Sequence, residues 1–210
     1  MRNIILKSAV VLALGIPLVA SAESQFRTTT GNSTANLDFE IIIPKFLSLQ
    51  VGTGAPFTTN ATVDKISFDM SATPGNVGNG TPVAATAASG DLGNGAVTAR
   101  VLSNNGNVNF SSTTLGALND GVVGENISYA LISTAVAAAP VNPTGTNLAH
   151  PTLADGATTT IVLTAVNKVV NQAAKWTYTY ANTLGTIPPA GTYGGTNTRN
   201  SRVTYTASLL

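Results

Sequence analysis

The sequence predicts an all-β fold of the sandwich or barrel type, because its dominant hydrophobic period is two residues. Apolar and polar residues alternate in several short segments, and Gly, Asn, Asp or Pro residues lie near the ends of these segments, as they do around strands. Turn sequences such as TPGNVGNGTP, SGDLGNG and SNNGN separate them, and their Asn-Gly steps supply the positive φ of tight turns. No repeat of fixed period is present, which disfavours a solenoid or a propeller.

Two alternating segments near the start of the chain flank a proline. As one strand, residues 37–51 would be about 50 Å long at ~3.3 Å per residue, so two strands are expected, over 35–43 and 47–51. Later strands are expected over 64–70, 96–102, 126–134, 158–166, 174–181 and 202–209. The best candidate for a helix is 133–139, and the prolines that follow would keep it short.

Residues 1–22 have the composition of a secretory signal peptide. Arg2 and Lys7 come first, an apolar run over 9–20 follows, and cleavage is expected before Glu23. The apolar run is shorter than the ~20 residues of a membrane span. We therefore expect a secreted product that has no membrane span once the signal peptide is removed.

Composition excludes several classes of function. The 210 residues less the 22 of the leader leave 188, with 8 basic and 9 acidic residues and a formal charge of −1. No basic cluster remains, so no nucleic-acid partner is expected. The charged fraction is 9%, against ~25% in ordinary globular domains. Cysteine is absent, so stability outside the cytosol must come from packing or from partners.

Groups that could carry catalysis are scarce. The only histidine, His150, lies in the loop-like sequence NLAHPTLADG, and a triad drawn with Asp155 lacks any Gly-x-Ser-x-Gly elbow. The carboxylates are mostly single and scattered, and one histidine without cysteine does not make an ordinary zinc site. We therefore expect no enzymatic activity, no cofactor and no metal.

The aromatic segment KWTYTYAN allows two interpretations. In an extended strand Trp176, Tyr178 and Tyr180 project from one face and threonines from the other. If the aromatic face is exposed, it is a platform for sugar rings, and the chain is a secreted carbohydrate-binding module. If it is buried, it is core, which is favoured because the opposite face would offer the core mainly threonines.

The C-terminal sequence IPPAGTYGGTNTRNSRVTYTASLL carries a family resemblance. Its motif comprises Pro189, Ala190, Gly191, Tyr193, Val203 and Tyr205. The motif resembles the end of chaperone–usher pilins of the alternate and archaic clades, the colonisation-factor and spore-coat-U-like subunits. The N-terminal alternating segment, a proline and a second apolar strand also resemble the alternate-clade major subunits, and the lack of cysteine agrees with that clade. The chain departs from the family in the inserted residues TNTRNSR, which allow a hairpin at this end.

The resemblance implies an immunoglobulin-like β-sandwich over residues 45–210 that lacks one strand, preceded by an N-terminal extension over 23–44. A neighbouring subunit would complete the sandwich with its own extension, by donor-strand exchange. The implied donor residues are Leu37, Phe39, Ile41 and Ile43, with Pro44 as a hinge. The implied function is that of a structural fimbrial (pilus) subunit at the cell surface, supporting adhesion or biofilm formation. Its implied partners are further copies of itself, a periplasmic chaperone and an outer-membrane usher.

The residues allow a second organisation. In a self-contained monomer, 35–43 and 47–51 would be one first strand that leaves one sheet at Pro44 and joins the other. A donor strand and a native first strand bury the same pattern of side chains, so the sequence leaves both organisations open.

Overall fold

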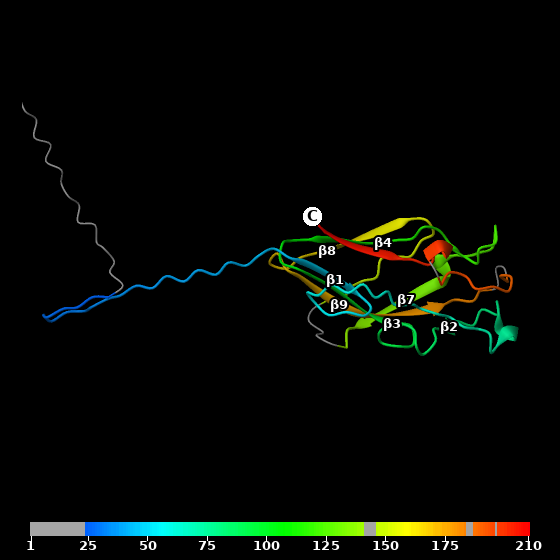
Figure 1. Ribbon diagram of the computed structural model, residues 1–210, viewed down its shortest axis with the longest axis horizontal. Helices are drawn as coiled ribbons and strands as arrows, with labels where there is room; N and C mark the ends of the chain where they lie inside the picture. The colour runs from blue at the N-terminus through cyan, green and yellow to red at the C-terminus, as the bar shows by residue number, and fades with distance from the viewer. Residues whose placement is uncertain (1–23, 141–145, 184–186, 196) are drawn as a thin grey trace, which may run out of the picture. The chain divides into compact units, whose positions relative to one another are not determined.

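The computed structural model describes residues 24–140, 146–183, 187–195 and 197–210 (Figure 1). The expected signal peptide lies outside the described residues. The chain divides into two units between Ile43 and Pro44. We call the described part of the first unit, 24–43, the N-terminal segment, and the second unit, 44–210, the β domain.

The larger sheet of the β domain, sheet A, has five antiparallel strands. They are β1 (Leu47–Val51), β2 (Val83–Ala84), β3 (Ala96–Ser103), β7 (Ile132–Ala138) and β9 (Val170–Tyr180). β9 is the central strand, because it pairs with β3 and with β7 over overlapping residues and therefore on opposite edges. β1 pairs with β3, and the short β2 pairs with the end of β9.

The second sheet, sheet B, has three antiparallel strands in the order β10-β4-β8. Their bounds are β4 (Val108–Thr113), β8 (Thr158–Leu163) and β10 (Thr204–Leu209). A two-stranded ladder joins β5 (Leu118–Asn119) to β6 (Asn126–Ile127). The described part of the chain contains no α-helix, only the 3-10 turns η1 (Pro74–Asn76), η2 (Tyr129–Leu131) and η3 (Asn197–Arg199). The all-β prediction is confirmed.

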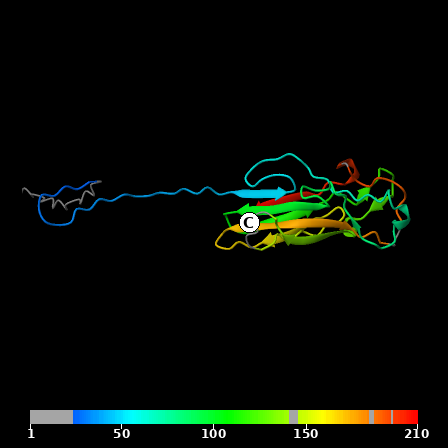
Figure 2. The same cartoon turned by 90° about the horizontal axis from the view of Figure 1, so that it is seen from below.

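Sheets A and B form two layers (Figures 1 and 2), and the hydrophobic core consists of side chains from both. Alternate residues of each strand enter it because side chains in a strand alternate between its two faces. Trp176 of β9 and Phe110 of β4 are both fully buried, with stacked rings whose centroids lie 6.0 Å apart. These two residues therefore tie the two sheets together.

Several sequence-based expectations need correction. Residues 126–134, expected as one strand, are divided between β6, the 3-10 turn η2 and the start of β7. Residues 133–139, the helix candidate, lie largely in β7, because their small side chains pair in register with β9. Residues 64–70 form no assigned strand, since their backbone partners lie in a turn: Thr86 N–H donates to the Ser67 carbonyl and Gly90 N–H to the Lys65 carbonyl. β4 was not expected at all, although it is the middle strand of sheet B.

The C-terminal insertion does not form the hairpin that its length allows. It contains η3, and β10 pairs only with β4 among the described strands. The last strand of the β domain is therefore a single strand that closes one end of sheet B.

We expect Trp176→Ala to lower the free energy of unfolding by about 3–5 kcal/mol, because it removes a fully buried indole from the contact between the two sheets. Thr177→Ala, on the opposite face of β9, is the matched control and should change stability by no more than about 0.5 kcal/mol. Urea unfolding of both variants measures the difference, and equal stabilities would contradict this role for Trp176.

Candidate functional site

The aromatic side chains of β9 do not form a surface platform. Trp176 is 0% exposed and Tyr178 is 6% exposed, and the indole Nε1–H donates to the Leu148 carbonyl at 2.8 Å. Tyr180 is half-buried with its ring centroid 6.1 Å from that of Phe68. The possible ligand platform of Trp176, Tyr178 and Tyr180 is therefore wrong, because the core takes up this face of the strand.

The lone histidine belongs to a polar network inside the β domain. His150 Nε2 lies 2.7 Å from the Tyr205 hydroxyl and 3.1 Å from the Tyr178 hydroxyl, and the two hydroxyls lie 3.0 Å apart. The His150 ring also meets the Trp176 ring edge-on, with centroids 4.6 Å apart. Tyr178 is in β9 and Tyr205 in β10, so this network joins sheet A, sheet B and the connection between β7 and β8.

Burial sets the charge state of this network. It lowers the pKa of His150 from 6.5 to about 4, against the opposing effect of a hydrogen bond with the backbone of Pro151. With the other ring nitrogen engaged by that backbone, Nε2 is left to accept a hydrogen bond from a phenol. Burial also raises the pKa of Tyr178 to about 12 and that of Tyr205 well above its usual value. All three groups are therefore neutral at pH 7, and the phenols are donors.

The carboxylate considered as a partner of His150 has a different role. Asp155 Oδ1 accepts a hydrogen bond of 2.8 Å from the backbone N–H of Tyr129, at the start of η2. The Tyr129 hydroxyl in turn donates to the Asn200 carbonyl. Asp155 thus fixes backbone, while His150 is occupied by tyrosines, an arrangement that orients side chains and does not resemble a catalytic triad.

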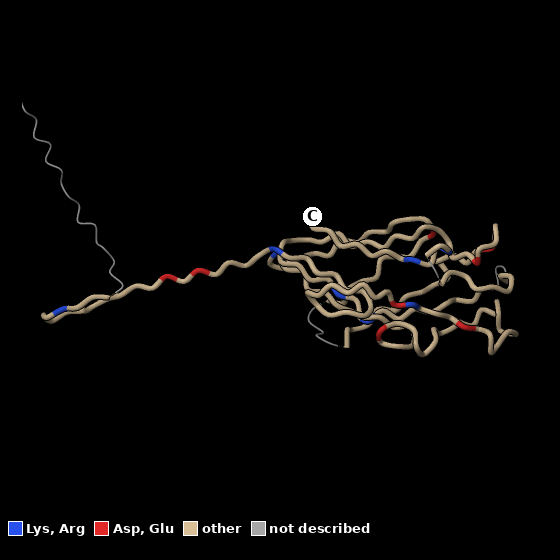
Figure 3. The backbone as a smooth tube through the Cα atoms, viewed as in Figure 1, with Lys and Arg blue, Asp and Glu red and all other residues tan. Residues whose placement is uncertain are grey.

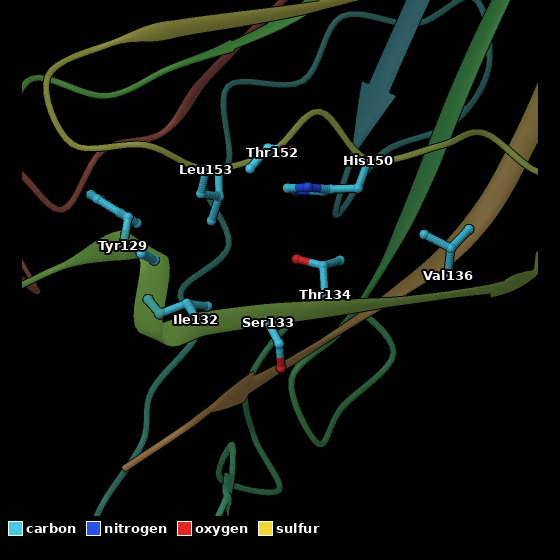
Figure 4. A pocket seen from close by; sticks show the side chains of 9 residues that line it. Tyr129, Ile132, Ser133, Thr134, Val136, His150, Thr152 and Leu153 are labelled. Atoms are coloured by element: carbon cyan, nitrogen blue, oxygen red, sulfur yellow. The ribbon is translucent and has the colours of Figure 1, made fainter. Parts of the chain in front are cut away.

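A pocket of about 350 Å³ lies beside His150, between β7 and residues 150–153 (Figure 4). Thr134, from β7, points across it toward His150, while Ser133 points away and donates to the Thr179 carbonyl. The lining residues are Tyr129, Ala130, Ile132, Ser133, Thr134, Val136, His150, Thr152 and Leu153. None of these nine carries a charge at neutral pH, so the pocket offers hydroxyl groups, the His150 imidazole and apolar groups.

Charged side chains do not gather into a metal site in the described part of the chain. Lys, Arg, Asp and Glu are scattered over the β domain (Figure 3), and no group of three or more His, Cys, Asp or Glu residues suited to a metal ion occurs among the described residues. Within the same residues, no helix has the length and apolar character needed to cross a membrane.

The N-terminal segment exposes its apolar side chains. The expected donor residues Leu37, Phe39, Ile41 and Ile43 are 73–87% exposed, and Ile42, on the alternate face, is 81% exposed. Residues 24–43 contain no assigned strand (Figure 1). A run of large apolar side chains left in water costs free energy that burial against a partner recovers.

One side chain fixes the start of β1 in the β domain. The Asn104 side-chain N–H₂ donates to the Pro44 carbonyl at 2.8 Å, and its oxygen accepts from the Phe46 N–H at 2.9 Å. Asn104 directly follows β3, whose last residue, Ser103, pairs with Leu47. The amide therefore extends the β1–β3 ladder past its end, to the expected hinge at Pro44.

β1 and β10 are both edge strands with incomplete burial. β1 pairs only with β3 and β10 only with β4 in the described chain, and the two strands contact each other without a ladder between them. All five residues of β1 are half-buried. The partly buried side chains that these elements add to the core are Leu47, Leu49, Val51, Val203, Tyr205 and Ala207. One backbone edge of β10 is thus left without a strand, above side chains that already touch the core.

The pilin-like C-terminal motif separates into two parts. Pro189, Ala190 and Gly191 lie in an exposed loop, where the Tyr193 hydroxyl donates to the Pro189 carbonyl at 3.0 Å. Val203 and Tyr205 instead pack against the core. The motif therefore combines a loop that turns back on itself with the strand that closes sheet B.

No protein-family model, curated protein or solved structure matches this chain.

Two important residues were not singled out from the sequence. The sequence places Asn104 in the turn SNNGN, and nothing local distinguishes it from Asn105. A lone histidine followed by proline fits a structural residue as well as a catalytic group, so the sequence around His150 does not reveal its network. Both act across long sequence separations, 60 residues for Asn104–Pro44 and 55 for His150–Tyr205, which no local pattern encodes.

We expect Asn104→Ala to lower the free energy of unfolding of the β domain by about 1–2 kcal/mol, since two backbone groups lose their partner. Asn105→Ala, one residue further in the same turn, is the control. Denaturant unfolding gives the stabilities, and hydrogen exchange at the Phe46 amide should accelerate only in the Asn104 variant. Unchanged exchange there would contradict the proposed clamp.

We expect stability to fall as the pH drops from 6.5 to 4. The folded pKa of His150, about 4, is below the value of 6.5 in an unfolded chain, so over this range the unfolded state binds the proton more readily. The loss should approach about 3 kcal/mol, at ~1.4 kcal/mol per unit of pKa difference. Thermal unfolding of His150→Gln should lack this component, and parallel pH profiles for the two proteins would contradict it.

Proposed function

We propose that this chain is a structural subunit of a surface fimbrium that polymerises by donor-strand exchange. One observation carries the proposal: β10 has an unpaired edge over core side chains, while the same chain holds the exposed alternating residues of the N-terminal segment. The free edge of β10 lacks a strand neighbour in the described chain, and the N-terminal segment lacks a surface that buries its apolar side chains. The resemblance of the C-terminal motif to chaperone–usher pilins supports the same function.

The order of strands supports an immunoglobulin-like sandwich that lacks its last strand. Such sandwiches place strands A, B, E and D in one sheet and C, F and G in the other. Sheet A reads β1-β3-β9-β7, which corresponds to A-B-E-D, and β4 and β10 correspond to C and F. The position of G is the free edge of β10, and β8 adds to the far side of β4. On this correspondence, a donated strand would run antiparallel to β10.

The energetics favour donation. Burying the side chains of Leu37, Phe39, Ile41 and Ile43 would contribute on the order of 6–12 kcal/mol, at ~1.5–3 kcal/mol each, before the cost of ordering the segment. Residues 35–43 span about 30 Å at ~3.3 Å per residue, longer than β10 with its six residues. The donor is therefore long enough to cover the whole free edge.

The self-contained monomer has less support. In that organisation residues 35–43 would continue a first strand into the other sheet, with Leu37 to Ile43 against the core. Leu47 and Leu49 of β1 pack on the core, whereas residues 35–43 belong to a separate unit that ends at Ile43. The break at Pro44 is then a link between two proteins, since proline cannot donate to a ladder.

The free edge of β10 also indicates which partners a subunit of this kind would need. An exposed edge strand is a template for aggregation, so a subunit of this kind needs a protecting partner before assembly. A periplasmic chaperone and an outer-membrane usher would supply that protection and order the exchange, and the secretory signal sequence agrees with export to the cell surface. The polymer would consist of further copies of this chain.

The experiment is a gel of surface material from cells that secrete the protein, with boiled and unboiled samples in detergent. We expect a ladder of multiples in the unboiled lane, because a donated strand dissociates slowly. Ile41→Asp should abolish the ladder, since it places a charge against the neighbour's core. Ile42→Asp, equally exposed but on the alternate face of the segment, is the matched control and should retain the ladder.

Because residues 41 and 42 lie outside the β domain, both Asp variants should leave the unfolding of the monomeric chain unchanged. A single monomer band in every lane, from material shown to be folded, would refute strand donation. Loss of the ladder in both variants would refute the assignment of the buried face.

A further inference from the structure

An exposed aromatic pair lies at the start of β1. The rings of Phe46 and Phe57 meet edge-to-face with centroids 5.2 Å apart, and Phe57 is 67% exposed. The Phe57 N–H is 3.4 Å from the Ser48 hydroxyl, which holds the ring beside the first residues of β1. We call Phe46 and Phe57 the aromatic pair.

The loop that carries Phe57 is closed and strained. Asp64 accepts hydrogen bonds from the backbone N–H and, at 2.8 Å, the hydroxyl of Thr53, so the two ends of residues 53–64 are joined. Phe57 has φ of +60°, a conformation that is unfavourable for a bulky residue. Backbone strain of this kind is kept where a contact or a function repays it. Contact with Phe46 leaves two thirds of the ring in water, so the intramolecular packing repays little.

Chain connectivity brings a neighbour to this pair; this step rests on the proposed function. If residues 35–43 lie in the next copy, only Pro44, Lys45 and Phe46 separate that copy's edge from Leu47. Four residue steps span at most about 14 Å. One end of the next copy must therefore lie against the aromatic pair and the exposed Lys45.

Strand direction selects that end. A donor antiparallel to β10 leaves the neighbour where β10 begins, at Thr204, which pairs with Thr113 at the end of β4. The turn between β5 and β6, residues 120–125, follows β4 at this same end, and Figures 1 and 3 place it away from the start of β1. In a head-to-tail fibre, this turn is the surface that meets the next copy.

The turn complements the aromatic pair in chemistry. Val122 is 56% exposed and Val123 fully exposed, which is uncommon for two adjacent apolar residues. Asp120 and Glu125 flank them, with carboxyl groups in hydrogen-bonding reach of each other. The surface that approaches carries apolar rings and one cation. The surface it meets carries two valines and two acidic groups, with the Arg199 guanidinium beside Gly121.

We propose that Phe57 and Lys45 of one copy contact the 120–125 turn of the next copy, and that this contact fixes the angle between successive copies. Strand donation alone joins the copies through residues 44–46, and Asn104 ties these residues only to their own β domain. The second contact makes that link rigid, so that the fibre has one defined geometry along its length.

The first test removes the ring without adding strain. Asparagine tolerates the backbone conformation of residue 57, so Phe57→Asn deletes the side chain alone. We expect the detergent-resistant ladder to persist, while electron microscopy shows fibres that bend irregularly and have lost their uniform angle. Val162→Asn, which removes an exposed apolar side chain from β8, is the matched control and should leave the fibre shape unchanged.

The second test exchanges charges. Lys45→Glu should speed the dissociation of unboiled polymers about two- to five-fold, as expected for loss of an exposed ion pair. Combining Lys45→Glu with Glu125→Lys should restore the wild-type rate, because the pair is re-formed with opposite signs. Equal rates for the single and the double variant would overturn the pairing of Lys45 with this turn.

The outcomes separate this contact from strand donation. A ladder whose fibres stay straight in Phe57→Asn would overturn the contact and leave donation intact. Absence of any ladder in the wild type would overturn both.

Discussion

The free backbone edge of β10 is the constraint on which the rest of the organisation depends. A strand at the edge of a sheet presents N–H and C=O groups that have no partner in the protein, and here the edge lies above a core that is only partly covered. β1 does not close this edge, because it belongs to the other sheet. In the proposed strand donation a strand from another copy would pair with β10, and the N-terminal segment has the length and the side-chain pattern of such a strand.

Because β10 has a ladder on one edge only among the described strands, other contacts must hold it in place. Tyr205 provides this in β10, since its ring stacks on Phe110 of β4 and its hydroxyl reaches His150 and Tyr178. The network is neutral and its hydroxyls are partnered, so it avoids the cost of burying an unpaired polar group. It links β10 to the centre of sheet A without any cysteine. Packing of Tyr205 thus holds β10, which has a strand neighbour on one edge only in the described chain.

Much of the fold could be predicted from the sequence, because most strands bury one face and therefore show a period of two. β1, β3 and β10 follow their expected ranges closely, whereas β8 ends three residues before its expected range does and β9 begins four residues earlier than expected. β4 was missed because its third inward residue is Ser112, whose hydroxyl bonds with Thr159 inside the domain, so the apolar alternation stops after Phe110. The helix expected over 133–139 was wrong because alanines there fit the edge of a sheet as well as a helix. The His150 network depends on contacts between elements that are distant in the sequence, and no local sequence pattern predicts such contacts.

The alternating run that the proline interrupts has a physical explanation in this arrangement. Leu47 and Leu49 are committed to the core of their own domain, and Asn104 holds the backbone at Pro44 and Phe46 whether or not the preceding residues are paired. Pro44 has no backbone N–H to donate to a ladder, so the pairing of residues 35–43 is independent of the pairing of β1. Two strands of one chain can then bury their side chains in two different proteins. A continuous strand would force both halves to follow one sheet, whereas under the proposed strand donation the break would let residues 35–43 pair in a neighbour while β1 stays in its own domain.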